Sequence, residues 1–335
     1  MISKPLMTNE IENYRLSIAP MMDCTDRHFR VLMRQITQRS LLYTEMIVAQ
    51  ALHFSKNRNK LLDFDEIEHP IAIQLGGDDP NLLAEAAEMA EDWGYDEINL
   101  NIGCPSSKVK SGNFGACLMG KPKTVANCIE KMKKSCKIPI TVKHRLGIDN
   151  LDSDDYLMNF VDSCSIAGAD RFIIHARKAW LNGLNPKENR TIPPLQYERV
   201  KKLKDERPEL IIELNGGINT IDECIKALRS FDGAMIGRAA YSRPYSWTKI
   251  DSMIYGQKEE YISRSKIIKR IIPFAQKHLE NDGRLWNISK HIINLIENIP
   301  NAKIIRQELS EKCQNNKANV AVLKKIAQQL EDAGH

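Results

Sequence analysis

Short apolar runs alternate with amphipathic segments over roughly the first 240 residues of this chain. The runs typical of buried strands are Ser17–Met21, Leu41–Ile47, Ile71–Leu75, Glu97–Asn101, Ile138–Lys143, Arg171–His175, Leu210–Asn215 and Gly233–Gly237. Apolar residues recur at helical spacing between them, as in Pro80–Trp93, Lys123–Lys134, Asp154–Ala167, Leu195–Asp205 and Ile221–Leu228. This alternation predicts a parallel sheet, and its eight units predict a closed (β/α)8 TIM barrel. An open doubly wound sheet is the alternative, but the first strand lacks the GxGxxG turn of that fold.

The pattern changes after Tyr241, where strand-like runs stop. Apolar residues at spacings of three and four predict helices over 262–279, 285–299 and 303–330. Pro273 is expected to kink or divide the first of these helices. We therefore expect a catalytic barrel over residues 1–242 and a smaller all-helical domain over residues 243–335.

Composition narrows the class of protein. With 335 residues, 42% hydrophobic and 27% charged, the chain has the make-up of a globular protein. No apolar stretch is long enough for a transmembrane helix, and residues 1–15 do not resemble an export signal. The eight cysteines form no CxxC pair, which predicts free thiols and no metal site. A cytoplasmic protein without a membrane association is expected.

Positive charge is concentrated in the C-terminal segment. Residues 243–335 contain 16 Lys and Arg against 10 Asp and Glu, a net charge of +6, whereas the rest of the chain has a net charge of −1. Such a segment is either a solvated helical surface or a module that binds a polyanion. Charge alone favours neither interpretation.

Polar and glycine residues gather where the predicted strands end, which is the active-site face of this barrel class. The last two strands end in Asn215-Gly216-Gly217 and Gly237-Arg238. Glycines let backbone N–H groups approach an anion, and a guanidinium adds a fixed cationic fork, so these two motifs predict a phosphate site. Two ordinary tight turns are the alternative interpretation.

Other strand ends carry groups suited to a flat heterocycle. Gln74, Lys143 and His175 supply donors and charge that would suit the polar edge of an isoalloxazine ring. Taken singly, such residues are more often satisfied core groups or a lysine that reaches solvent. Cys104, in Asn-Ile-Gly-Cys-Pro, places a thiol on a strand-end loop, where it can act as a nucleophile or a proton donor.

These motifs together resemble the tRNA-dihydrouridine synthases. The matching segments, in order, are Ala19-Pro20-Met21-Met22-Asp23, Ile73-Gln74-Leu75-Gly76-Gly77, Asn99-Leu100-Asn101-Ile102-Gly103-Cys104-Pro105, Val142-Lys143-His144-Arg145, Ile174-His175-Ala176-Arg177, Asn215-Gly216-Gly217-Ile218 and Ile236-Gly237-Arg238. The stretch Arg177–Leu184 and the Lys187-Glu188-Asn189-Arg190 motif resemble the bacterial subfamily that acts on D-loop uridines at tRNA positions 20 and 20a.

The resemblance implies an FMN-dependent reduction of the uracil 5,6 double bond, with NADPH as the electron source. It implies that Pro20, Met21 and Met22 pack on the flavin, and that Gln74, Lys143 and His175 bind its polar edge. Asn215, Gly216, Gly217, Gly237 and Arg238 would bind the FMN phosphate. Asn101 would orient the uracil, and Cys104 would be the general acid.

The substrate implied is tRNA, whose phosphates need cationic contacts. Lys187 and Arg190 on the insertion, and Lys303 and Arg306 on the tail, are the candidate contacts, with a solvated surface as the alternative for each. No obligate protein partner is expected, and a monomer is the default. Two other functions remain open: an FMN barrel enzyme acting on a small molecule, and a tRNA-binding folding factor with a vestigial flavin site.

Overall fold

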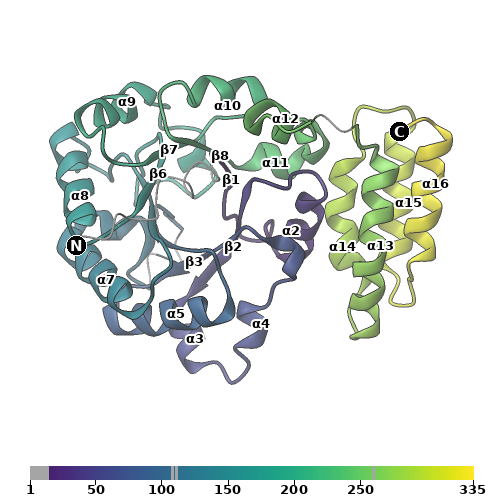
Figure 1. Ribbon diagram of the computed structural model, residues 1–335, viewed down its shortest axis with the longest axis horizontal. Helices are drawn as coiled ribbons and strands as arrows, with labels where there is room; N and C mark the ends of the chain where they lie inside the picture. Colours follow the sequence, from purple (N-terminus) through teal and green to yellow (C-terminus); the bar gives the residue numbers. More distant parts are fainter. Residues whose placement is uncertain (1–14, 107–108, 110–111, 259–260) are drawn as a thin grey trace.

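Eight parallel strands form a closed barrel in which β1 to β8 follow one another in chain order (Figure 1). The computed structural model describes residues 15–106, 109, 112–258 and 261–335; residues 1–14, which include most of the segment considered above for an export signal, lie outside this part. The strands are β1 Leu16–Ile18, β2 Leu41–Val48, β3 Ile71–Gly76, β4 Glu97–Ile102, β5 Ile140–Arg145, β6 Arg171–His175, β7 Ile212–Asn215 and β8 Gly233–Ile236. The pairing of β1 with β8 closes the barrel and confirms the predicted fold.

Helices surround the barrel and cover its outer face (Figure 1). They are α2 Arg27–Arg34, α3 Ala49–Phe54, α4 Asn59–Leu62, α5 Pro80–Trp93, α7 Pro122–Ser135, α8 Asp154–Ile166, α9 Tyr197–Glu206, α10 Ile221–Ala227, α11 Arg238–Ser242 and α12 Ile250–Tyr255. Short 3-10 helices span Glu66–Glu68, Gly115–Gly120, Glu188–Arg190 and Pro244–Trp247. Local signals set the helix bounds: Asp79 caps α5 ahead of Pro80, and Gly94 ends the helix with φ +96°.

Side chains alternate between the inside and the outside of the barrel. On β4, Ile98, Leu100 and Ile102 belong to the large apolar core shared with the surrounding helices. Their neighbours Glu97, Asn99 and Asn101 make polar contacts inside the barrel, beside a small apolar cluster that includes Leu41, Tyr43 and Ile173. The barrel interior is therefore substantially polar, which is what positions the site described below.

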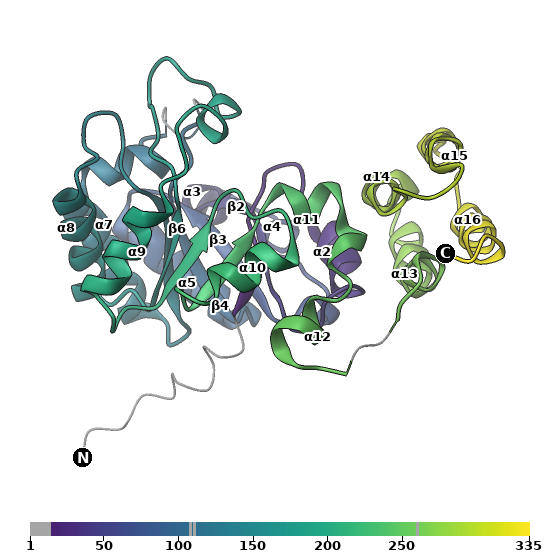
Figure 2. The same ribbon diagram turned by 90° about the horizontal axis from the view of Figure 1, so that it is seen from above.

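The described residues of the tail form four α-helices, which lie beside the barrel (Figures 1 and 2). They are α13 Arg264–Glu280, α14 Leu285–Ile292, α15 Ala302–Gln314 and α16 Ala321–Asp332, with a 3-10 turn at Ile293–Leu295. The single helix predicted over 303–330 is wrong, because the chain turns between α15 and α16. Of the two outcomes expected at Pro273, division is wrong because α13 runs through this proline, whereas a kink there stays a prediction.

The barrel and the tail meet through α2 and α14. Asp26 caps α2 by accepting a hydrogen bond from the Phe29 amide at 3.0 Å. Its carboxylate also contacts Lys290 Nζ at 2.7 Å and His291 Nε2 at 2.9 Å. One carboxylate thus serves both a barrel helix and two side chains of the tail.

The segment following residue 243 still packs on the barrel. Arg15 donates to the Ile254 carbonyl oxygen, and the Leu16 amide donates to Tyr255 Oη at 3.0 Å. We propose that the boundary between barrel and tail lies between Tyr255 and Arg264, later than the expected position near 243. No helix in the described part of the chain combines the length and apolar character needed to cross a bilayer.

Candidate active site

Lys143, Asn215 and His175 lie at the ends of three neighbouring strands. Lys143 Nζ donates to Asn215 Oδ1 at 3.0 Å, and Asn215 Nδ2 donates to the Met235 carbonyl oxygen at 2.9 Å. Burial, followed by the nearby Arg145, lowers the pKa of Lys143 to about 8. The ammonium group is therefore held in a place that favours a negatively charged ligand.

His175 supplies an imidazole that is neutral in the ordinary pH range. Burial, together with Arg145 and Lys143, lowers its pKa well below the usual value. Among the described residues, its Nδ1 is buried without a hydrogen-bond partner. Buried polar atoms are nearly always paired in native proteins, so this atom fits contact with a bound polar ligand.

Two glycines follow β7 in a conformation that other residues rarely adopt. Gly216 and Gly217 have φ values of +107° and +76°. A Cβ atom on Gly217 would lie 2.5 Å from both Leu195 Cδ1 and Tyr197 Oη. Tyr197 Oη also donates to the Gly216 carbonyl oxygen at 2.7 Å, which fixes the turn.

The residues that follow β8 and β1 lie beside this glycine turn, at the end of the barrel where the strands terminate, which we call the barrel mouth. Gly237 precedes α11, whose first residue is the exposed Arg238. A Cβ atom on Gly237 would lie 4.0 Å from Met21 Sδ, so the segment Pro20-Met21-Met22 borders the glycine turn. Met22 is 55% exposed. A cationic fork, a glycine turn and a bordering methionine fit a phosphate attached to a flat ring, as expected for FMN.

Cys104 is held by the residues on either side of it in the fold. The backbone N–H groups of Gly103 and Cys104 donate to Asn101 Oδ1 at 3.1 and 3.0 Å. The Cys104 carbonyl oxygen accepts from the Ala116 amide at 2.9 Å, and the side chain is partly exposed. Asn101 Nδ2 donates to Gln74 Oε1 at 2.8 Å. The structure therefore links the proposed acid, the proposed uracil contact and Gln74 directly.

Arg145 supports the site through hydrogen bonds, and the sequence analysis gives this residue no role. Its Nε donates to the Gly103 carbonyl oxygen at 3.0 Å, and its Nη1 donates to the carbonyl oxygens of Asn189 at 2.9 Å and Lys178 at 3.1 Å. This guanidinium ties the Cys104 loop to the insertion after β6. The available signal is the two-residue spacing of Thr141, Lys143 and Arg145 on β5.

The four candidate tRNA contacts fall into two separate places. Lys187 and Arg190 are exposed on the insertion, which projects from one side of the barrel (Figure 2). Burial and the nearby Arg238 lower the pKa of Arg190, so this residue lies at the barrel mouth. Lys303 and Arg306 are exposed on α15 and belong to the tail.

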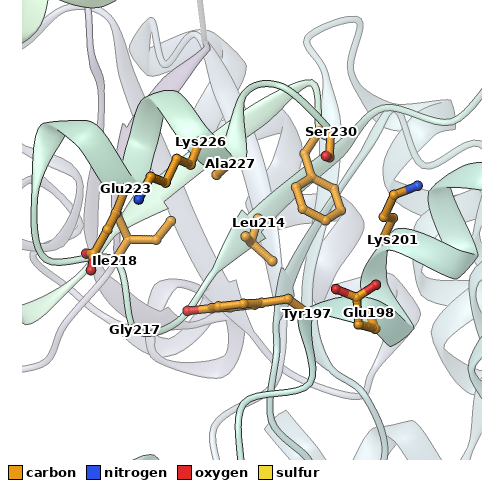
Figure 3. Close-up of a pocket in the computed structure, with 11 residues that line it drawn as sticks. Tyr197, Glu198, Lys201, Leu214, Gly217, Ile218, Glu223, Lys226, Ala227 and Ser230 are labelled. Carbon is orange, nitrogen blue, oxygen red and sulfur yellow. The ribbon is translucent and has the colours of Figure 1, made fainter.

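A cavity of about 300 Å³ lies outside the barrel, between α9 and α10 (Figure 3). Its lining includes Tyr197, Leu214, Gly217 and Phe231, with Lys201 and Lys226 from the two helices. The residues expected to bind FMN share only Gly217 with it. Among the described residues, no group of three or more His, Cys, Asp or Glu side chains is arranged to hold a metal ion.

Known proteins share the sequence over most of its length. The dihydrouridine synthase family matches residues 17–331. A tRNA-dihydrouridine(20/20a) synthase of Synechocystis is 53% identical over 296 residues, covering 88% of each chain. One of Shewanella oneidensis is 46% identical over 316 residues, covering 94% of this chain and 93% of that protein.

A more distant likeness concerns the fold alone. A complex of 2-naphthoyl-CoA reductase has a TM-score of 0.55 at 12% identity, over 72% of this chain and 50% of that one. The family match and the close relatives span both the barrel and the tail. The chain therefore belongs to the dihydrouridine synthase family.

Proposed function

We propose that this protein is an FMN-dependent tRNA-dihydrouridine synthase that uses NADPH to reduce D-loop uridines at positions 20 and 20a. The positions come from the names of its relatives. The observation that carries the chemistry is the placement of Cys104, whose loop is held by Asn101 at the same mouth as Lys143 and His175. A thiol and the polar groups expected to hold the flavin then lie at one end of the barrel.

The residues at the mouth divide the work of holding FMN. The phosphate would be contacted by Asn215, Gly216, Gly217, Gly237 and Arg238. The polar edge of the ring would be contacted by Gln74, Lys143 and His175. Pro20, Met21 and Met22 would pack against its apolar part. When bound, FMN supplies the hydride that adds to C6 of uracil, after taking electrons from NADPH.

Cys104 would donate the proton that C5 of the uracil requires. Its backbone is fixed on both sides, because the Cys104 N–H group donates to Asn101 Oδ1 and the Cys104 carbonyl oxygen accepts from the Ala116 N–H group. Asn101 would orient the base from the same strand end. A donor held in position can transfer its proton as the charge develops at C5, which is the contribution of a general acid.

The substrate base must leave the folded tRNA to enter the barrel mouth. Arg190 lies at the mouth, and Lys187 is close to it in sequence on the same exposed insertion. Figure 2 shows α15 on the side of the tail towards which the insertion projects. We propose that the insertion and α15, with Lys303 and Arg306, contact phosphates of one tRNA.

The test is to map dihydrouridine on unmodified tRNA transcripts. The full-length protein, FMN and NADPH are incubated with a transcript that carries uridine at positions 20 and 20a, and with transcripts that carry cytidine at one or both. We expect product at each position that retains uridine and none on the double replacement. Dihydrouridine at other positions of the tRNA would contradict the assignment to positions 20 and 20a. Reduction of free uridine or of small enones instead of tRNA would favour an enzyme that acts on a small molecule.

The remaining alternative is a tRNA-binding folding factor. It predicts tRNA binding without any dihydrouridine in the same assay. The intact Cys104, Lys143 and Arg238 argue against it, because a factor without turnover needs neither a proton donor nor the groups expected to hold a flavin.

A further inference from the structure

A chain of side-chain hydrogen bonds crosses the barrel interior from the Cys104 loop to a buried ion pair. Asn101 Nδ2 donates to Gln74 Oε1 at 2.8 Å, and Gln74 Nε2 donates to Asn99 Oδ1 at 2.8 Å. Asn99 Nδ2 donates to Thr141 Oγ1 at 2.9 Å, and Thr141 Oγ1 donates to Glu97 Oε1 at 2.7 Å. We call these five residues the interior chain.

Glu97, the last residue of the interior chain, only accepts hydrogen bonds. Glu97 forms an ion pair with Arg171 at 2.5 Å and accepts from Tyr43 Oη at 2.6 Å. All three residues are at most 5% exposed. Because an ionised carboxylate has no hydrogen to donate, the Thr141 hydroxyl must donate to Glu97 and can only accept from Asn99.

Asn101, at the other end of the interior chain, fixes the same donor-to-acceptor direction. Asn101 Oδ1 accepts from the backbone N–H groups of Gly103 and Cys104, so its Nδ2 must face Gln74. The Gln74 oxygen then faces Asn101, and its nitrogen faces Asn99. Amide orientations are usually ambiguous in structures, but here the fixed donors and the fixed acceptor at the two ends permit one orientation throughout.

We propose that Asn99 and Thr141, anchored by Glu97, are positioning residues for the reaction. They hold the amide of Gln74 in one orientation towards the cofactor site, and through Asn101 they hold the backbone that carries Cys104. This role rests on the proposed function for its chemical consequence. The restraint of the Cys104 loop by hydrogen bonds that begin at Thr141 does not require a bound cofactor.

Thr141→Val tests the role because it keeps the shape of the side chain and removes its hydroxyl. Asn99 Nδ2 then loses its acceptor, and the orientation of the amides above it is no longer fixed. Thr141→Ser retains the hydroxyl. Thr37→Val is a matched control, since Thr37 is equally buried and its hydroxyl contacts Ser40 and Asp251 outside the barrel interior.

The first measurement is hydrogen exchange by mass spectrometry on the full-length protein without FMN. The peptide containing Gly103 and Cys104 should exchange at least about tenfold faster in Thr141→Val than in the wild type. Thr141→Ser and Thr37→Val should leave that peptide within about threefold of the wild-type rate. Equal exchange in Thr141→Val and the wild type would overturn the proposal, as would an equal increase in Thr37→Val.

The second measurement separates the two half-reactions of the FMN-loaded protein. Thr141→Val should slow the reaction of the reduced enzyme with tRNA by about tenfold or more. Reduction by NADPH should change by a smaller factor, because it is affected only through Gln74, whereas the tRNA step is affected through both Gln74 and the Cys104 loop. Thr141→Ser should restore the tRNA step. A wild-type tRNA step in Thr141→Val, despite faster exchange, would overturn the positioning role. An inactive wild-type protein would instead overturn the proposed function, and the exchange measurement would still decide whether Thr141 holds the loop.

Discussion

Lys143 combines a positive charge with an enclosed position at the proposed flavin site. Burial, aided by Arg145, lowers its pKa to about 8. Below that pH the ammonium group attracts an anionic ligand, and above it the group becomes neutral and the attraction is lost. FMN affinity should therefore be nearly constant from pH 7 to 8 and fall above pH 8, by up to about tenfold per pH unit.

This prediction is checked by titrating the FMN-free protein with FMN between pH 6.5 and 10 and following flavin fluorescence. Lys143→Gln cannot lose a proton in this range, so its affinity should be lower at pH 7 and flat with pH. The same alkaline fall in Lys143→Gln would assign the titration to another group.

At the residue scale, sequence patterns located strand ends but not the contacts between them. Lys143 and Asn215 were both expected at the cofactor, and the structure joins them directly. Arg145, Asn99 and Thr141 were not assigned roles, although each occupies an inward position of its strand. A period of two shows which side chains face the interior, but only the register between strands shows which of them meet.

At the element scale, the eight strands were predictable because each is a short apolar run bounded by turn residues. The break between α15 and α16 was missed for a local reason. Asn315 accepts from the Lys317 amide and Asn319 from the Ala321 amide, both at 2.9 Å. These side chains compete with the helical hydrogen bonds and end the helix, although the apolar spacing continues.

Pro273 is the reverse case, because the helix continues where a division was one of the two expected outcomes. A proline lacks the N–H group for the helical hydrogen bond and usually interrupts a helix. Here Ile267, Ile268, Ile271 and Ala275 are buried on either side of it, and α13 packs along α16. Burial of this face maintains the helix, which single-residue rules do not anticipate.

The junction between α2 and α14 leads to a prediction about Asp26. Burial would raise the pKa of this carboxyl, but hydrogen bonds from His291 and Lys290 outweigh burial and hold it well below the usual range. Asp26→Asn keeps an oxygen for the cap of α2 and removes the charge facing the tail. We expect a loss of about 1–3 kcal/mol in the free energy of unfolding, measured by chemical denaturation near pH 7.

Asp79→Asn is the matched control, because Asp79 also caps a barrel helix, where its carboxylate accepts from the N–H groups of Asn81 and Leu82. The Asp79→Asn substitution should lower the free energy of unfolding only slightly. Since the pKa of Asp26 is depressed in the folded protein, its contribution is present above the ordinary carboxyl pKa and lost as the pH falls below it. An Asp26→Asn variant as stable as Asp79→Asn would show that the junction charges contribute nothing.

At the scale of the whole molecule, the positive charge and the proposed chemistry occupy different regions. The excess of positive over negative charge lies in the tail, whereas the remainder of the chain is nearly neutral. If α15 contacts phosphates, Lys303→Ala and Arg306→Ala should each flatten the plot of log tRNA affinity against log salt by about 0.7–0.9. Reduction of bound FMN by NADPH should not change in either variant.

A salt titration of tRNA binding checks this prediction, with Lys131→Ala on α7 as the control. Lys131 is also an exposed helical lysine, and α7 lies on the side of the barrel away from the tail (Figure 1). Unchanged slopes for Lys303→Ala and Arg306→Ala would place the tRNA elsewhere. A shortened protein for the same purpose should end after Tyr255 rather than near Tyr241, because α12 contacts β1.

The most direct test of the account is the reaction of the reduced enzyme with tRNA in Cys104→Ala. The FMN-loaded protein is reduced with NADPH without oxygen and mixed with unmodified tRNA, and reoxidation of the flavin is followed by absorbance. We predict normal reduction by NADPH and a tRNA step slowed by roughly 10²–10⁴-fold, with Cys24→Ala and Cys117→Ala close to the wild type. A wild-type tRNA step in Cys104→Ala, or equal defects in all three variants, would contradict the assignment of Cys104 as the proton donor.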